Sequence, residues 1–167
     1  FAALSLVEFI FQGCYRLTQL PIRMPGKLQV FCGFVTNNTL PIMPSSIEKL
    51  SLIRSSNIMQ TDVFRKLTHT RLRFLNVSMC FTMYRIPAEI ASFSLLEHLD
   101  VSFCTWLSTL PTELCALNQT LRVLDVSMCS ELDLHTEYFE PFQALRELVA
   151  YGVLRDANFL KAVMPNC

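Results

Sequence analysis

The 167-residue sequence has few of the residues that several common kinds of functional site require. It contains four glycines and one tryptophan, and no glycine-rich stretch has the spacing of a phosphate-binding loop or a dinucleotide fingerprint. Its three histidines (His69, His98 and His135) share no spacing and accompany no serine or cysteine nucleophile in a recognisable motif. We therefore expect that the protein is not an enzyme and binds no cofactor.

The sequence also lacks a stretch that could cross a membrane, although 51% of its residues are hydrophobic. The longest uncharged stretch, residues 28–47, carries two Asn, two Thr, two Ser and two Pro. A spanning helix needs about 20 predominantly apolar residues, so we expect no membrane span and attribute the apolar content to a protein core.

The net charge is zero, because 14 Lys and Arg balance 14 Asp and Glu. Nucleic-acid binding depends largely on neutralising phosphates with basic side chains, so we expect no nucleic-acid partner. The charges are nevertheless separated along the chain: residues 1–84 carry a net charge of +6 and residues 85–167 a net charge of −6. This separation would steer a partner of complementary charge, and a merely solvated surface is the alternative.

The strongest pattern is an internal repeat of 24–25 residues. The pattern LxxLxVxxC begins at Leu72, Leu96 and Leu121, and these copies contain the nearly identical strings LNVSMC, LDVSFC and LDVSMC. Weaker copies begin at residues 145, 47, 28 and 6. Seven repeats account for the chain as a single domain, residues 1–167: 6–27, 28–46, 47–71, 72–95, 96–120, 121–144 and 145–167.

The spacing inside each repeat predicts one short strand. The last two apolar positions of LxxLxV alternate, which is typical of a strand with one buried face. Such a strand buries that face only when neighbouring repeats stack into a parallel sheet. Between the strands we expect helices over residues 61–67 and 135–142, and two more whose first turn includes Pro87 and Pro111. The second repeat has no room for a helix, so we expect it to be extended.

This pattern resembles the leucine-rich repeat superfamily, LxxLxLxxN/CxL. The resemblance covers essentially all 167 residues and is most specific from residue 72 to 132. It implies an α/β solenoid, a right-handed horseshoe with a parallel concave sheet and with helices or extended segments on the convex side. The Cys followed by LxxLP, as at Cys104, resembles the intracellular repeats of plant disease-resistance receptors, and the Cys alone is similar to F-box type repeats.

Cysteine usage indicates compartment and structural role. Seven cysteines is an odd number without the tight spacings of a small secreted framework, so we expect an intracellular location, cytoplasmic or organellar. The repeat cysteines would lie in a line at about 4.8 Å per strand, whereas zinc needs ligands clustered around one point. The resemblance implies instead that they point inward and hydrogen-bond neighbouring backbone. We therefore predict a structural cysteine ladder and no metal site, with the ladder formed by Cys14, Cys80, Cys104 and Cys129.

The outward positions of the strands are the candidate binding residues. Aromatic side chains there flank a polar stripe of Asn, Asp and Ser, which is the composition of an interaction patch. Asp100 and Asp125 should lie side by side, either as a functional carboxylate pair or as ordinary solvated repeat residues. Met79, Phe103 and Met128 either face the solvent or turn into the core. The predicted protein-binding residues are Phe74, Asn76, Ser78, His98, Asp100, Ser102, Val123, Asp125, Ser127, Glu147 and Tyr151.

These features together predict a non-catalytic scaffold that binds other proteins. Neither end of the repeat array shows a polar cap, and solenoids normally need caps, so we expect a fragment or a subunit whose ends are covered by missing sequence or by other chains. The alternative is a recognition domain of a receptor or ubiquitin-ligase adaptor. Three sequons, at Asn37, Asn76 and Asn118, would accept glycans if the protein were secreted.

Overall fold

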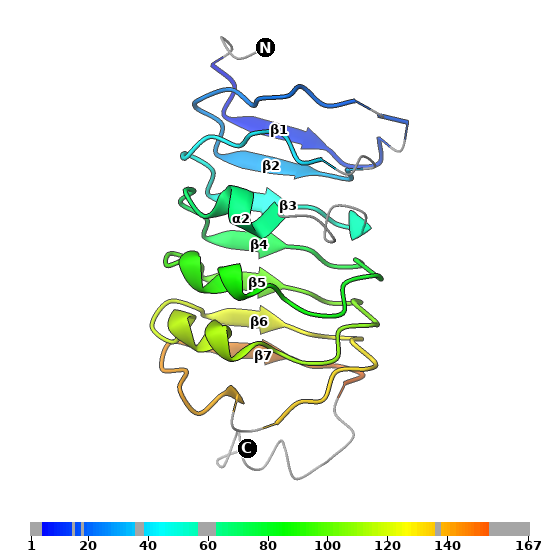
Figure 1. The fold of residues 1–167 in the computed structure, drawn as a ribbon, viewed down its shortest axis with the longest axis vertical. Helices are drawn as coiled ribbons and strands as arrows, with labels where there is room; N and C mark the ends of the chain where they lie inside the picture. Colours follow the sequence, from blue (N-terminus) through cyan, green and yellow to red (C-terminus); the bar gives the residue numbers. More distant parts are fainter. Residues whose placement is uncertain are drawn as a thin grey trace.

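The computed structural model describes residues 5–14, 16–17, 19–35, 39–56, 63–135 and 138–153. These residues form one seven-stranded parallel sheet whose strands follow one another in chain order, so each repeat stacks on the previous one (Figure 1). One strand falls in each of the seven predicted repeats. The strands are β1 (Glu8–Phe11), β2 (Val30–Gly33), β3 (Lys49–Ser51), β4 (Phe74–Asn76), β5 (His98–Asp100), β6 (Val123–Asp125) and β7 (Glu147–Val149).

The strand register follows the repeat. In the three most similar repeats, Leu75 pairs with Leu99 and Leu99 with Leu124 across the sheet. All three leucines are buried, whereas the residues on either side of each are half-buried. A shift of one residue would turn every leucine toward the solvent, so burial of this one face fixes the pairing.

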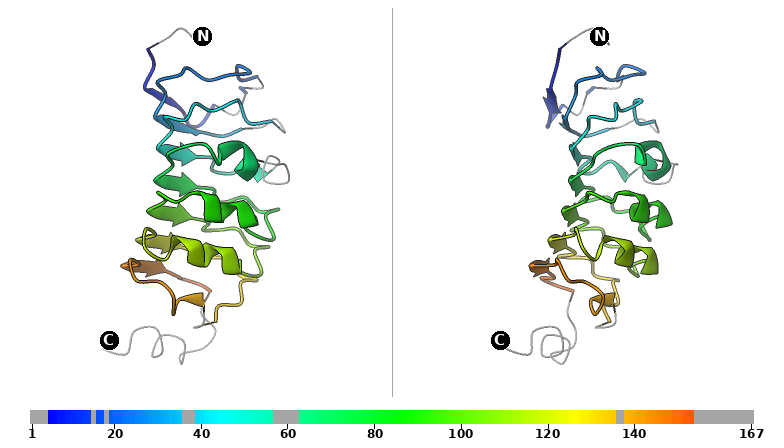
Figure 2. Two further views of the ribbon diagram at one scale, coloured as in Figure 1. Left: turned by 60° about the vertical axis from the view of Figure 1, so that its left-hand side comes forward. Right: turned by 90° about the vertical axis from the view of Figure 1, so that its left-hand side faces the viewer.

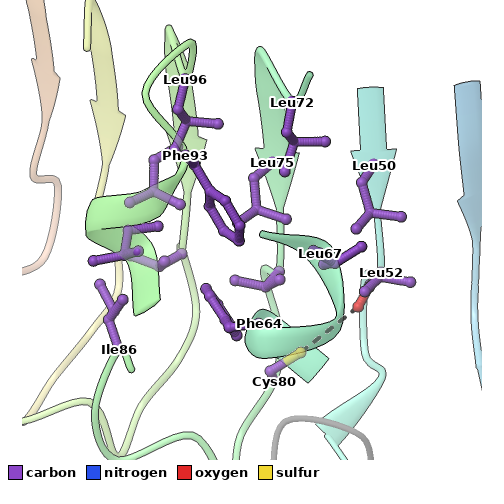
Figure 3. Packing of buried hydrophobic residues seen from close by; sticks show 14 of the residues in the cluster. Leu50, Leu52, Phe64, Leu67, Leu72, Leu75, Cys80, Ile86, Phe93 and Leu96 are labelled. Carbon is purple, nitrogen blue, oxygen red and sulfur yellow. Dashed lines mark hydrogen bonds between the residues drawn. The ribbon is translucent and has the colours of Figure 1, made fainter. Parts of the chain in front are cut away.

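The core runs the whole length of the stack between the sheet and the opposite side of the coils. Leucines of the predicted pattern, such as Leu72, Leu75 and Leu96, converge there with Phe64 and Phe93 (Figure 3). Burial of these side chains accounts for the high apolar content. Within the described part of the chain, no helix is long and apolar enough to cross a membrane.

Short helices lie on the face of the stack opposite the strands (Figure 2): the α-helix α2 (Val63–Leu67) and two 3₁₀ helices, η1 (Ala88–Ser92) and η2 (Thr112–Leu117). Pro87 and Pro111 stand immediately before η1 and η2, one position earlier than predicted. Both have extended backbone, with ψ of 148° and 144°. Proline suits these places because its fixed φ starts a helix and its missing N–H needs no partner.

Two other connecting segments can be compared with the sequence. The second repeat has no helix in its described residues and runs extended, with Ile42 bridging to Arg23, as predicted. In the described part of the amphipathic helix predicted over residues 135–142, Tyr138 is 3₁₀-helical, but residues 139–141 form turns, so the prediction is wrong after Tyr138. Pro141 explains the difference, because an interior proline removes a helical hydrogen bond. The predicted helix start at residues 61–62 lies outside the described residues.

Gly33, at the end of β2, is required by close packing against the ring of Phe11. A Cβ built on Gly33 would lie 2.2 Å from Cζ of Phe11. The ring is itself held against Phe31, with 5.2 Å between the ring centroids. We expect Gly33→Ala to lower the free energy of unfolding by about 1–3 kcal/mol, because the ring must move out of a packed site. Urea denaturation followed by circular dichroism measures this loss.

Gly26 provides the matched control for Gly33→Ala. A Cβ on Gly26 meets no atom within 4 Å, so we expect Gly26→Ala to change stability by less than about 0.5 kcal/mol. Shortening Phe11 to leucine should reduce the penalty of Gly33→Ala, because the clashing ring atoms are gone. An unchanged penalty in the Phe11→Leu background would contradict the packing explanation.

Candidate protein-binding face

The strand side of the stack is gently concave and carries the outward residues of β1 to β7 (Figure 2). We call this surface the concave face. The strand pairing aligns its residues in two columns across the sheet. The first column is Lys49, Phe74, His98, Val123 and Glu147, and the second is Ser51, Asn76, Asp100, Asp125 and Val149.

The first column contains an aromatic stack. The rings of Phe74 and His98 lie 4.5 Å apart between centroids, at an interplanar angle of 21°. Nζ of Lys49 lies 4.8 Å from the centroid of the Phe74 ring, so a cation covers one end of the stack. Val123 is half-buried and Glu147 is exposed. Sequence reasoning placed these residues on one face but did not predict that Phe74 and His98 stack.

The second column is a hydrogen-bonded polar stripe. Nδ2 of Asn76 donates to Oδ2 of Asp100 at 2.6 Å. Oδ1 of Asp100 accepts from the backbone N–H of Ser102 at 2.9 Å, and Oδ1 of Asp125 accepts from that of Ser127 at 2.8 Å. The two aspartates pair in register, as predicted. Their oxygens hold the turns after the strands, a role that short acidic side chains commonly play.

Three predicted binding residues are buried and must be corrected. Ser78, Ser102 and Ser127 are only 5%, 8% and 8% exposed. Their backbone N–H groups are bonded to the Asn or Asp two residues earlier, and the Ser78 hydroxyl also donates to Oδ1 of Asn76. The serines therefore support the polar stripe, and the prediction that they face the solvent is wrong.

Just beyond the ends of the strands, four residues with large side chains have a left-handed backbone conformation. Met79, Phe103 and Met128 have φ of 58°, 58° and 60°, and Arg54 has φ of 62° at the same position of the third repeat. The N–H of Cys104 bonds to the carbonyl of Val101, which closes a tight turn of type II with Phe103 in the left-handed position. The N–H of each left-handed residue continues the ladder to the next repeat, as from Phe103 to the carbonyl of Ser127 at 2.7 Å.

These side chains are neither fully outside nor in the core. Phe103 is 39% exposed and Met128 is 38% exposed, while Met79 is half-buried. We call Met79, Phe103 and Met128 the apolar ridge. Tyr151 is strongly exposed beyond β7, and its carbonyl accepts the N–H of Met128 at 2.7 Å. The structure therefore joins Tyr151 to the end of this ridge.

Three cysteines form the predicted ladder. Sγ of Cys80, Cys104 and Cys129 donates to the carbonyls of Leu52, Val77 and Val101 of the preceding repeat, at 3.6, 3.4 and 3.2 Å. Burial raises the pKa of the Cys80 thiol to about 12 and that of Cys129 to about 11, and it raises the pKa of Cys104 strongly as well. The six cysteines of the described residues are free thiols, and no group of three or more metal-ligating side chains occurs among those residues.

Cys14 does not belong to this ladder, contrary to the prediction. Its side chain is exposed. The other three thiols bond to a carbonyl of the preceding repeat, and β1 is the first strand of the described sheet. In the described sheet, the Cys14 thiol therefore has no equivalent carbonyl to which it could donate a hydrogen bond.

Two of the sequons lie in ordered structure. The side-chain amide of Asn76 is occupied by Asp100 on one side and by Ser78 on the other, so a glycan there would disrupt the polar stripe. The backbone carbonyl of Asn118 accepts the N–H groups of Gln143 and Ala144, each at 3.0 Å. Asn37 lies outside the described residues.

A hollow of about 270 Å³, which the sequence pattern does not predict, lies at the β1–β3 end of the concave face. Gly13, Gly33, Arg54 and Met79 form part of its lining. The available signal was the glycine at position 13, which occupies the place of Met79 and Phe103 in later repeats. A larger hollow of about 520 Å³ lies near α2 and η1, and Arg65 and Glu89 in its lining pair with each other at 3.3 Å.

Comparison with known proteins gives a distant structural likeness. No protein-family model matches the sequence, and no curated protein matches it significantly. Among solved structures, the chain is similar to the leucine-rich repeat domain of the type III effector XopL, with 18% sequence identity and a TM-score of 0.47. The match covers 77% of this chain and 44% of that one, so the chain spans less than half the length of that structure.

The fold of this chain is established by its own geometry. One short strand per repeat, seven parallel strands in chain order and a leucine register set by the repeat define a leucine-rich repeat solenoid.

Proposed function

We propose that the chain is a non-catalytic scaffold that binds a protein partner through its concave face, as one part of a larger assembly. The observation that carries this proposal is the apolar ridge of Met79, Phe103 and Met128. A left-handed backbone costs a non-glycine residue roughly 1–2 kcal/mol, yet three successive repeats place large apolar side chains there. At the same position, Gly13 and Gly152 adopt positive φ without a side chain.

These side chains support a binding role because their partial burial does not offset the cost of the left-handed backbone. Phe103 and Met128 remain more than one-third exposed, so the core gains only part of their apolar area. Backbone strain of this kind concentrates at ligand-binding positions. Methionine is also common at protein-binding surfaces because its flexible side chain adapts to a partner.

The charges beside the ridge indicate the chemistry of the partner. Asp100 and Asp125 lie in the neighbouring column, and Glu147 is exposed on β7. A segment with apolar side chains for the ridge and Lys or Arg side chains for these carboxylates would complement this end of the face. The free thiols of the described residues support an intracellular location for this scaffold.

Selection from a random 12-residue peptide display library tests the proposal. We expect peptides enriched on the native chain to combine apolar residues with Lys or Arg. Phe103→Asn should weaken their binding at least tenfold, because it removes the central ring of the ridge while asparagine tolerates positive φ. Fluorescence anisotropy with the selected peptides measures the dissociation constants.

Leu95→Asn is the matched control for Phe103→Asn. Leu95 is 38% exposed, close to the value for Phe103, and it lies just before the first leucine of a repeat and away from the ridge. Peptide binding should be unchanged in this variant. Equal losses in both variants, or selected peptides that bind Phe103→Asn as tightly as the native chain, would contradict the proposal.

A further inference from the structure

A hollow at the β1–β3 end of the concave face arises because the column of large side chains is interrupted there. In later repeats Met79, Phe103 and Met128 fill this column, whereas the first repeat has Gly13. Gly33 also lines the hollow, although the space that its Cβ would take is filled by the Phe11 ring, whereas a Cβ on Gly13 would meet no atom within 4 Å. The result is an open space of about 270 Å³.

Arg54 lines this hollow, and its guanidinium group has hydrogen-bond donors that are not used. Its backbone is fixed by the left-handed turn and by the N–H bond to the carbonyl of Ser78 at 3.0 Å. Its Nε donates to Sδ of Met79 at 3.3 Å, and a thioether is only a weak acceptor. Among the described residues, no carboxylate forms an ion pair with Arg54.

The charge of the concave face changes sign between β3 and β7, and the exposed Glu8 adds a carboxylate on β1. Lys49 on β3 is exposed and lies over Phe74, so the β3 region carries two cations, Lys49 and Arg54. The acidic residues Asp100, Asp125 and Glu147 lie on β5, β6 and β7. Strands spaced about 4.8 Å apart place β7 about 19 Å from β3, beyond the Debye length of about 8 Å at physiological salt. The two ends therefore act on a partner separately.

We propose that this hollow binds the side-chain carboxylate of an Asp or Glu in the protein partner, with Arg54 as its donor. This inference rests on the proposed function of the concave face. The planar guanidinium offers two parallel N–H donors to a carboxylate, and Ile53 and Met79 in the lining offer apolar contact to the stem or to a neighbouring side chain.

An internal acidic residue fits better than a chain terminus because the hollow opens onto the face that continues toward Asp100. The partner segment then runs along the concave face with an acidic residue at the Arg54 end and basic residues at the β5–β7 end. The opposite charges at the two ends fix the direction in which the partner binds.

Nuclear magnetic resonance titration of the isotope-labelled chain with capped dipeptides tests the assignment. The probes are acetyl-Leu-Glu-amide, acetyl-Leu-Gln-amide and acetyl-Leu-Leu with a free carboxyl terminus. We expect the Glu probe to shift the amide signals of Gly33 and Ser51 and the Nε–H signal of Arg54. It should bind at least tenfold more tightly than either other probe, and added salt should weaken it.

Arginine variants show whether Arg54 is the donor. Arg54→Gln should weaken binding of the Glu probe at least tenfold, and Arg54→Lys should weaken it less, because the charge remains while the paired donors are lost. Arg71→Gln, which removes an exposed arginine outside the hollow, should have no effect. Equal binding of the Glu and Gln probes, preference for the free terminus, or full binding by a folded Arg54→Gln variant would overturn the assignment.

The peptides selected by display separate failure of this inference from failure of the proposed function. If Phe103→Asn abolishes their binding while Arg54→Gln leaves it unchanged, the concave face binds the partner and the carboxylate assignment is wrong. If neither variant changes binding, both proposals are wrong. Loss in both variants, with an acidic residue shared by the selected peptides, supports both.

Discussion

Replacing Phe93 with alanine is expected to lower the free energy of unfolding by about 3–5 kcal/mol, the usual cost of deleting a buried aromatic side chain. Phe93 is only 2% exposed and follows η1, where its N–H bonds to the carbonyl of Ile90. Its ring stacks on Phe64, with 5.8 Å between centroids, and so joins the third repeat to the fourth (Figure 3). Loss of this ring leaves a cavity at the middle of the stack.

The position of Phe93 makes the expected loss larger than its area alone suggests. In a solenoid each repeat contacts mainly its neighbours, so stability depends on the repeat interfaces. A weakened central interface divides the stack, and we expect the urea dependence of the unfolding free energy to become shallower as the two halves unfold separately. Urea denaturation followed by circular dichroism measures both the midpoint and the slope.

Phe81→Ala is the matched control for Phe93→Ala because it makes the same chemical change in the same repeat. Phe81 is 47% exposed, so its replacement should change stability by no more than about 0.5 kcal/mol. Similar losses at Phe81 and Phe93 would show that aromatic content, and not the interface between repeats, determines stability.

The sequence contained enough information to predict the sheet. The spacing of Leu75, Leu99 and Leu124 fixes one strand per repeat, and burial of one face sets the register that the structure shows. This succeeds because the alternation within a strand and the stacking of neighbours are both direct consequences of the repeat. The inward cysteines of the later repeats follow from the same regularity.

The predictions that were wrong concern features that depend on contacts between repeats. Ser102 was expected to face outward because alternation was continued past the strand, whereas the left-handed turn at Phe103 ends that alternation. The turn is fixed by a backbone bond to Ser127 of the next repeat, and no local pattern contains this partner. Cys14 failed for the related reason that the described sheet has no strand before β1.

The binding features that were missed arise from differences between repeats. The stack of Phe74 on His98 requires two different residues at one position of adjacent strands. The hollow beside Arg54 depends on Gly13 of the first repeat, at the position that Met79 occupies in the fourth. A regular pattern predicts what the repeats share, so it gives the scaffold, whereas the departures from the pattern give the surface that a partner would contact.

Raising the pH above 9 is expected to destabilise the protein steeply through its buried thiols, which are the three of the ladder and Cys32, whose pKa is raised by burial as well. The ordinary pKa of 9.0 is raised to about 12 for Cys80 and about 11 for Cys129, because burial disfavours the thiolate, and it is raised for Cys104 as well. In the unfolded chain these thiols ionise near pH 9, while in the folded chain they keep their protons. From pH 9 to about 11 the unfolded state therefore binds fewer protons, and the unfolding free energy falls as pH rises.

The slope of the unfolding free energy against pH depends on how many thiols take part. Each thiol contributes about 1.4 kcal/mol per pH unit once it is ionised in the unfolded chain, so the three of the ladder together approach about 4 kcal/mol per unit. Urea titrations between pH 7.5 and 10.5 measure the slope. Cys129→Ala should reduce it by up to about 1.4 kcal/mol per pH unit, whereas Cys14→Ala, which removes an exposed thiol, should leave it unchanged. A flat profile above pH 9, or equal slopes in the native chain and in Cys129→Ala, would show that the ladder thiols do not govern the alkaline transition, because only groups with different proton affinity in the two states can tilt it.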